Sequence, residues 1–281
     1  MVHKEANKIS YVELPQPSMM LTIEPLDYAN PYDFKALHRH DYFEIVLVKE
    51  GSGSQLIDFS PYDMQAGEIF VIYPGQVHLM KRNTANGLLI QFKKDLFEYI
   101  NPVKHYHLYS SPSYRYDAEL FSHLYDMTAR INALVQQPNL TSVARHKAYS
   151  YLQIILITLI EAHSDKLFID KEHFLFTEYL SLVTANIHTK KKVADYGDMM
   201  NCSAAKLNEV CKKSIDRTAL EVIHEELLLE IRRLLLLNEL SFKEISYHLN
   251  FDSPSNFNAF IKNKTGLTPK ELQHAVLEIY N

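Results

Sequence analysis

Cysteine is scarce in this sequence: only Cys202 and Cys211 occur among 281 residues. Two cysteines are too few for a disulfide framework, and their spacing matches no cysteine-based metal site. A chain that does not depend on disulfides is typical of a reducing compartment, so we expect a cytoplasmic protein.

Long hydrophobic runs are also absent. Residues 1–20 contain no apolar segment of the kind that a secretory signal peptide requires. The most apolar stretch, YSYLQIILITLIEA at 149–162, is too short to span a bilayer and is interrupted by Ser150, Gln153 and Thr158. We therefore expect no membrane association and interpret this stretch as a buried helix.

Charge of one sign does not predominate. The chain has 29 Lys and Arg against 34 Asp and Glu, with 47% hydrophobic and 22% charged residues. This is the composition of an ordinary globular protein rather than a disordered one. The net charge of −5 does not by itself indicate a nucleic-acid-binding protein, and the length suffices for two or three domains.

The sequence changes character along its length. After an irregular segment at 1–18, which we expect to be an arm, residues 19–93 contain short Val, Ile, Phe and Tyr runs separated by turn residues. This pattern predicts antiparallel strands in a small barrel or sandwich. The segment 94–170 is expected to be a helical linker and 171–281 a helical domain. Within the linker, apolar residues at helical spacing predict a hairpin of two helices, at 117–135 and 142–164.

Within the β-like region, LHRHDYFEIVLVKEGSG at 37–53 sets four polar side chains at alternating positions, His38, His40, Tyr42 and Glu44. Alternating residues of a β-strand point to the same face. Imidazoles and a carboxylate in one place can hold a transition metal. Histidine and tyrosine rings can equally line a pocket with their polar tips hydrogen-bonded, so both interpretations are open at this point.

A repeat occupies the C-terminal third. MNCSAAKLNEVCKKSIDRTALE at 200–221 aligns with LNFDSPSNFNAFIKNKTGLTPKE at 249–271, which indicates one supersecondary motif used twice. Each copy predicts a short helix, a tight turn and a second helix, at 193–213 and 242–264. Asn201 and Asn250 occupy the turns, where a positive φ is needed and asparagine tolerates it. Ser203 and Ser253 follow as helix N-caps.

The second helix of each copy has the side chains of a DNA reader. Small, amide and basic residues can hydrogen-bond base edges and phosphates in a major groove. Residues 218–238 predict one continuous helix of roughly 30 Å, close to the pitch of about 34 Å that separates successive major grooves. The expected DNA-contacting residues are Lys206, Asn208, Lys212, Ser255, Asn256, Asn258 and Lys262.

Residues 177–281 contain 13 Lys and Arg against 14 Asp and Glu. Because neutralising phosphates contributes much of the affinity for DNA, we expect weak binding by a monomer, strengthened by dimerisation or by specific base contacts.

The runs FDSPSNF and TGLTP, within 240–273, resemble the DNA-binding domain of the AraC/XylS family of bacterial transcription regulators. The family often has arginine where this chain has Glu209 and Ala259, so the resemblance implies DNA contacts at these positions too. Residues 19–165 resemble the cupin sensor and helical linker of many members. His38-x-His40-x₃-Glu44-x₆-Gly51 is similar to the first cupin motif, and the segment from Gly67 to His78 to the second, with a displaced turn at Pro74-Gly75. In cupin enzymes, the positions of His38, His40, Glu44 and His78 bind a metal.

These observations predict an α+β protein: an N-terminal cupin-type β-barrel with a helical linker, followed by an all-α C-terminal domain of two helix-turn-helix units. The predicted function is a sequence-specific DNA-binding transcription regulator, not an enzyme, controlled by a small-molecule effector in the barrel. We expect double-stranded DNA as a partner, a homodimer, and RNA polymerase as a candidate partner. A sugar is one candidate effector, and we expect no cofactor, metal or catalytic residue. The expected ligand residues are His38, His40, Tyr42, Glu44 and His78.

The alternative is a metal-dependent cupin enzyme, a dioxygenase or isomerase, with a helical interaction tail.

Several other features have two interpretations each. His105 and His107 alternate as ligands do, but no carboxylate is near them and surface positions are favoured. The 18 tyrosines, with no tryptophan, suit a sugar-stacking pocket or ordinary packing. The run Lys190–Lys192 predicts a phosphate contact or a solvated helix end. A group of apolar residues predicts a dimer seam or packing on helix 117–135, namely Leu152, Ile155, Leu156 and Leu159.

Overall fold

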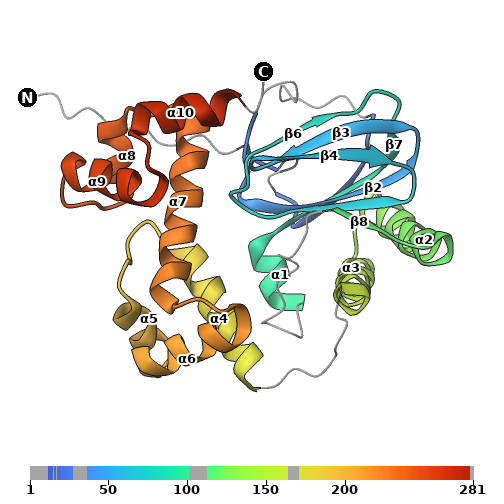
Figure 1. Cartoon of the computed structure of the whole chain (residues 1–281). Coiled ribbons are helices and arrows are strands. Elements are labelled where there is room, and N and C mark those ends of the chain that lie inside the picture. Colours follow the sequence, from blue (N-terminus) through green and yellow to red (C-terminus); the bar gives the residue numbers. More distant parts are fainter. Residues whose placement is uncertain are drawn as a thin grey trace, which may run out of the picture. The chain divides into compact units, whose positions relative to one another are not determined.

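The computed structural model describes residues 12–14, 16, 18–27, 37–100, 113–163 and 171–278 (Figure 1). The chain divides into two compact units, one spanning Ser10–Leu167 and the other containing the residues from Phe168 onward. His105, His107 and most of the expected arm at 1–18 lie outside the described residues.

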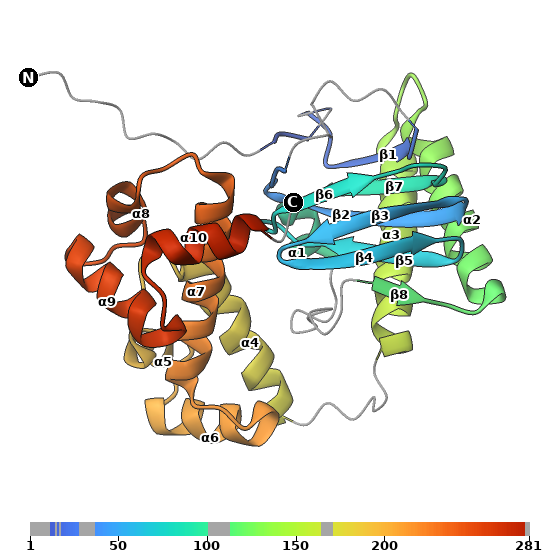
Figure 2. The ribbon, with the colours of Figure 1, turned by 45° about the horizontal axis from the view of Figure 1, so that its top comes forward.

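The first unit is a two-sheet β-structure with helices on one side (Figure 2). The order of the five-stranded sheet is β1-β7-β2-β5-β8, and that of the three-stranded sheet is β4-β3-β6, with antiparallel pairing throughout. The strands are β1 (Leu21–Pro25), β2 (Tyr42–Glu50), β3 (Ser52–Ile57), β4 (Ser60–Gln65), β5 (Glu68–Ile72), β6 (His78–Lys81), β7 (Asn86–Lys93) and β8 (Ser113–Arg115).

The expectation of a barrel is corrected by this topology, because no strand ladder joins the two sheets within the described residues. The chain passes from one sheet to the other at Gly51, between β2 and β3. Gly51 has a φ of 77°, and a Cβ there would lie 1.9 Å from the carbonyl oxygen of Thr84. Only glycine fits this close, left-handed corner, so the polypeptide can turn sharply here. The strand before the corner belongs to one sheet and the strand after it to the other.

The alternation along β2 divides the core in two. Phe43, Ile45 and Leu47 face outward from the sheet pair and pack with apolar residues of the helical layer. Val46 and Val48 face the interior between the sheets, where they pack with residues of β3, β4 and β5. The helical layer consists of α1 (Lys94–Ile100), α2 (Ala118–Val135) and α3 (Ser142–His163).

The predicted helical hairpin is confirmed as α2 and α3. Leu152, Ile155, Leu156 and Leu159 of α3 are all buried in the core that this unit forms with its own sheet and α2. Packing within the unit is therefore the correct alternative for these residues, and they are not available as a dimer seam. An α-helix hydrophobic on this face gains most by covering the adjacent apolar sheet.

The second unit is helical, and its predicted helices are confirmed. A continuous helix, α7, joins two helix pairs, as the sequence predicts. None of the described helices combines the length and hydrophobicity that a bilayer span requires. The helices are α4 (Lys171–Asn186), α5 (Val193–Met199), α6 (Ala204–Ile215), α7 (Ala219–Leu237), α8 (Phe242–His248), α9 (Pro254–Thr265) and α10 (Pro269–Glu278).

The turns between the paired helices follow the predicted chemistry. Asn201 and Asn250 have φ values of 50° and 52°, in the left-handed region. Ser203 and Ser253 cap α6 and α9 by accepting hydrogen bonds from backbone N–H groups three residues later, at 3.1 and 3.2 Å. Local side-chain chemistry thus determines where each recognition helix begins.

Candidate ligand site and nucleic-acid interface

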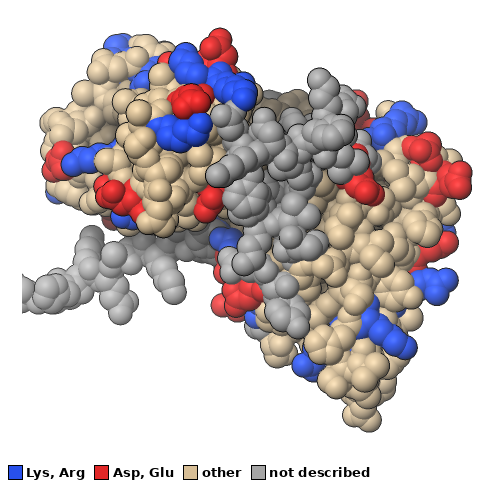
Figure 3. All heavy atoms as spheres, turned by 90° about the horizontal axis from the view of Figure 1, so that it is seen from below, with Lys and Arg blue, Asp and Glu red and all other residues tan. Residues whose placement is uncertain are grey.

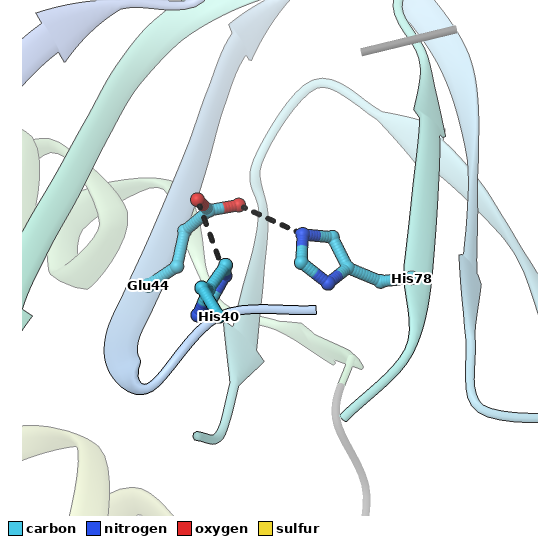
Figure 4. A group of neighbouring side chains, drawn as sticks. All are labelled: His40, Glu44 and His78. Carbon is cyan, nitrogen blue, oxygen red and sulfur yellow. Dashed lines mark ion pairs between the residues drawn. The ribbon is translucent and has the colours of Figure 1, made fainter. Parts of the chain in front are cut away.

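A group of polar side chains lies at one end of the interior between the two sheets (Figure 4). Tyr42 and Glu44 are on the interior face of β2, and His40 lies two residues before that strand begins. His78 begins β6 in the opposite sheet. Most of the remaining interior residues are apolar and form one cluster.

Glu44 lies between the two buried imidazoles. Its carboxylate oxygens are 3.8 Å from His40 Nε2 and 3.9 Å from His78 Nε2, which is too long for hydrogen bonds. The Nδ1 atoms of His40 and His78 face the backbone carbonyls of Tyr42, at 2.8 Å, and Gln76, at 3.3 Å. Because a carbonyl only accepts, each neutral ring carries its proton on Nδ1 and presents the lone pair of Nε2 toward Glu44.

Burial determines the charges of this group. Desolvation, assisted by the neighbouring His38, lowers the pKa of His40 to about 3. The pKa of His78 is also well below its usual value, mainly through desolvation. Burial raises the pKa of Glu44 to about 7, against a hydrogen bond from Gln91 that favours the ionised form. Near neutral pH, the group therefore consists of two uncharged imidazoles and a carboxyl that gains or loses a proton easily.

The five ligand residues that the sequence predicts lie together. The His40 ring stacks on Tyr42 with 3.9 Å between centroids, and the His38 ring is 4.3 Å from that of His78. His38 is only partly buried, so it lies at the margin of the group. The ligating atoms of His40, Glu44 and His78 all lie within 4.8 Å of one another, and imidazole nitrogens with a carboxylate are donors that suit a divalent transition metal.

Three further polar residues are buried in the sheets: Gln91 and Thr22 adjoin this group, whereas Gln55 lies farther along β3, opposite Tyr62 and Met80 of the neighbouring strands. Gln91 of β7 lies opposite Glu44 and donates a hydrogen bond of 3.1 Å to its carboxylate; Thr22 of β1 is next to Gln91. Gln55 of β3 is almost fully buried, and neither its amide nitrogen nor its amide oxygen has a hydrogen-bond partner among the described residues. It has the same parity as Ile57, which faces the interior. For Gln91, the signal in the sequence is a single amide within the apolar run LLIQF at 88–92, but strand register is needed to place it opposite Glu44.

On the second recognition helix, α9, the predicted DNA-contacting side chains are all exposed. They form the solvent-facing side of the helix, opposite the buried Phe257 and Ile261. Asn256 has one weak side-chain contact, 3.5 Å from Asp252. The exposed residues are Ser255, Asn256, Asn258, Ala259 and Lys262.

On the first recognition helix, α6, the predicted residues have intramolecular partners. Lys206 forms an ion pair of 3.0 Å with Glu209, and Lys212 lies 3.8 Å from Asp216. The side-chain oxygen of Asn208 accepts a hydrogen bond of 2.9 Å from the backbone N–H of Ala219, at the start of α7. The oxygen of Asn208 is thus used within the fold.

Charges on the surface are mixed. On the face that Figure 3 shows, Lys and Arg side chains are interspersed with Asp and Glu. This agrees with the nearly balanced count in the C-terminal part of the sequence. Where the charge of a helix-turn-helix domain is this nearly balanced, recognition of DNA depends more on specific base contacts than on a broad positive field.

Comparison with known proteins assigns a description to each unit. Residues 22–117 match the family model of the AraC-like ligand binding domain, and residues 196–275 match that of a helix-turn-helix domain. The chain is 21% identical over 244 residues to the HTH-type transcriptional activator RhaS of Yersinia pestis bv. Antiqua (strain Angola), covering 84% of this chain and 88% of that protein. Among solved structures, ToxT from Vibrio cholerae O395 is 15% identical, with 91% and 97% of the chains covered and a TM-score of 0.41. An AraC-type regulator from Chromobacterium violaceum is 25% identical, with 36% and 90% covered and a TM-score of 0.33.

Proposed function

Because this chain belongs to the AraC/XylS family of transcription regulators, we propose that the polar end of its β-unit is the effector site and that α6 and α9 read DNA. The chain is a DNA-binding regulator with a ligand-binding domain. We infer that it is a cytoplasmic protein and not an enzyme.

The observation that carries the effector site is a set of buried polar atoms without partners. His40 Nε2 and both amide atoms of Gln55 are buried and make no hydrogen bond within the described residues. Leaving a buried polar group unpaired costs about 1–3 kcal/mol, so a ligand that supplies the missing partners gains affinity.

The chemistry of these atoms favours a neutral, hydroxyl-rich ligand. The Nε2 lone pairs and the Glu44 carboxylate accept hydrogen bonds, while the Gln55 amide both donates and accepts. The stacked rings of His40 and Tyr42 and the adjacent apolar interior suit the carbon face of a sugar ring. We propose a monosaccharide as the effector class, bound by His38, His40, Tyr42, Glu44 and His78, together with Gln55 and Gln91.

Effector binding would act on DNA by linkage. A ligand that binds one arrangement of sensor and reader more tightly than another shifts the equilibrium between them by that difference in affinity. The test is a thermal-shift screen of monosaccharides on the full chain. Gln55→Leu should abolish the stabilising shift of any hit and leave the unliganded melting temperature unchanged or higher, since it removes two unpaired atoms. A full shift in that variant would count against this site.

We also propose a homodimer and a contact with RNA polymerase. The balanced charge of the reader predicts weak binding by one copy, and two copies on adjacent sites would strengthen it. A contact with RNA polymerase is proposed because the relative RhaS is a transcriptional activator. The mass of the DNA complex in solution tests the dimer: one copy per operator would contradict it.

A second candidate for the same site is a divalent transition metal, held by His40, Glu44 and His78. The favouring observation is that the Nε2 lone pairs of two histidines and the carboxyl group of Glu44 converge on one place. The backbone carbonyls that hold each Nδ1 act as the outer partners that metal-bound histidines normally have. A bound metal would act as a Lewis acid, and the enzyme alternative depends on it.

Metal analysis of purified chain separates these candidates. Stoichiometric iron, manganese or zinc that is lost in His78→Ala would favour the metal. Substoichiometric metal, unchanged in that variant, would leave the organic effector as the occupant.

A further inference from the structure

The two helix-turn-helix copies contact each other directly, apart from their connection through α7. The segment His188–Lys191 lies just before α5 of the first copy, and Asn250 and Phe251 form the turn of the second copy. Three interactions join Thr189 and Lys191 to Asn250 and Phe251, and all lie within the helical unit.

Lys191 makes two of these interactions. Its ammonium group donates a hydrogen bond of 2.5 Å to the backbone carbonyl of Asn250 and lies 4.7 Å from the centroid of the Phe251 ring. A charge-assisted hydrogen bond and a cation–π contact from the same nitrogen hold the lysine in one direction. This contact accounts for the middle residue of the Lys190–Lys192 run, which the sequence suggested for phosphate or solvent.

The third interaction runs in the opposite direction. The side-chain amide of Asn250 donates a hydrogen bond of 3.3 Å to the backbone carbonyl of Thr189. Asn250 therefore accepts a hydrogen bond from the first copy with its backbone carbonyl and donates one to the first copy with its side-chain amide. Nearby, the ring of His188 meets the ring of His248 edge to face at 4.8 Å.

These contacts lie at the turn that sets the direction of the second recognition helix. Asn250 has a left-handed backbone, and Ser253, three residues later, caps α9. A fixed turn fixes the start of α9 relative to the first copy. Two recognition helices that are already held in a fixed arrangement bind a two-part DNA site with a smaller loss of conformational entropy than two mobile helices would.

We propose that Lys191, Thr189 and Asn250 form a latch that sets the separation and angle of the two recognition helices, and that Lys191 is thereby a positioning residue for the spacing of the DNA half-sites. The latch rests on the proposal that α6 and α9 both read DNA. The latch makes a prediction that a general role in stabilising the fold does not. Loss of the latch should weaken the preference for one spacing between the two parts of the DNA site, in addition to any loss of affinity.

The experiment begins with the full chain and a random pool of double-stranded DNA. The wild-type chain should enrich a motif with two parts at one fixed spacing. Two fragments are then made from it, one unchanged and one with a base pair inserted between the parts, which displaces the second part by about 3.4 Å and rotates it by about 35°. The ratio of the two dissociation constants measures spacing discrimination.

Lys191→Met, which keeps the chain length beside Phe251 but loses the charge and the donor, should reduce this ratio by about three- to tenfold. Lys191→Arg should preserve most of it. Lys192→Met is the matched control, because Lys192 is exposed and makes no side-chain cap hydrogen bond at the start of α5; its ratio should equal that of the wild type.

The repeat supplies a second pair of variants. Asn250→Gly and Asn201→Gly both place glycine at a position with a positive φ, which glycine adopts more easily than asparagine. Only the first substitution removes a hydrogen bond of the latch. Asn250→Gly should relax spacing and Asn201→Gly should not.

An unchanged ratio in Lys191→Met, or an equal loss of affinity for both fragments, would overturn the latch and indicate a phosphate contact or a general role in the fold. Failure of the wild-type chain to enrich a two-part motif would instead overturn the assignment of α6 and α9, before any variant is made.

Discussion

The two helix-turn-helix copies have closely similar turns and caps but use equivalent positions differently. In the first copy, Asn208 binds the N–H of Ala219 at the start of the next helix. In the second copy, the equivalent of Ala219 is Pro269, which has no N–H to donate. Asn258, the equivalent of Asn208, is exposed on α9. One change from alanine to proline thus leaves an asparagine available for DNA.

The same contrast extends along the recognition helices. Lys206 and Glu209 pair with each other on α6, whereas Asn256 and Ala259 at the equivalent positions of α9 cannot form an ion pair. We infer that the second copy provides most of the base readout. The side chains of the first recognition helix, α6, are used more for contacts within the helical unit that supports α9.

The largest expected difference concerns the two equivalent asparagines. Asn258→Ala should weaken binding to the enriched motif by about 5- to 150-fold, because a paired asparagine–adenine contact provides about 1–3 kcal/mol of discrimination. Its stability should not change, since the side chain is exposed. Asn208→Ala should instead lower stability by about 1 kcal/mol with a smaller effect on sequence preference.

DNA titration and urea unfolding of both variants measure these effects. Equal effects of the two substitutions in both assays would remove the contrast between the copies.

A double-mutant cycle tests the reason for that contrast. In an Ala219→Pro background, the N–H that Asn208 binds is absent, so Asn208→Ala should no longer cost stability. The predicted coupling energy between the two positions is about 1 kcal/mol, measured by urea unfolding. Independent, additive effects would show that Asn208 stabilises the unit through some other contact.

The smallest expected effect lies at the ends of the recognition helices. Both end in a left-handed residue, which is Asp216 with a φ of 56° in the first copy and Gly266 with a φ of 76° in the second. Asp216→Gly should stabilise the chain by about 0.5–1 kcal/mol by relieving that conformation, because the exposed pair with Lys212 that it removes contributes little. Gly266→Ala should destabilise it by a similar amount. A loss of stability in Asp216→Gly would mean that the contact with Lys212 outweighs the backbone.

Local signals explain why much of the reader unit could be predicted from the sequence. The turns and caps of both copies follow from residue type and spacing, because they depend on interactions within a few residues along the chain. The residues concerned are Asn201, Ser203, Asn250 and Ser253. The use of Asn208 was not predictable in the same way. It depends on a residue 11 positions away, and on the absence of that N–H in the other copy.

The sensor unit was harder to predict because its site is assembled across strands. The alternation at His38–Glu44 indicated one face of a strand, and the residues it brings together do lie in one place. Gln55 and Gln91 come from other strands, and their positions depend on register. The separation into two sheets depends on a corner at Gly51 that contacts a distant carbonyl, which no local pattern shows.

The most direct test of the account is the affinity of the full chain for DNA from upstream of its own coding sequence, measured with and without each monosaccharide. We predict that the chain binds a fragment of this region and that at least one sugar changes the dissociation constant by about 5- to 150-fold. Gln55→Leu should abolish this response and keep the affinity of the unliganded chain. Absence of binding to any upstream fragment, with or without sugar, would contradict the conclusion that this chain is a DNA-binding regulator controlled by an effector.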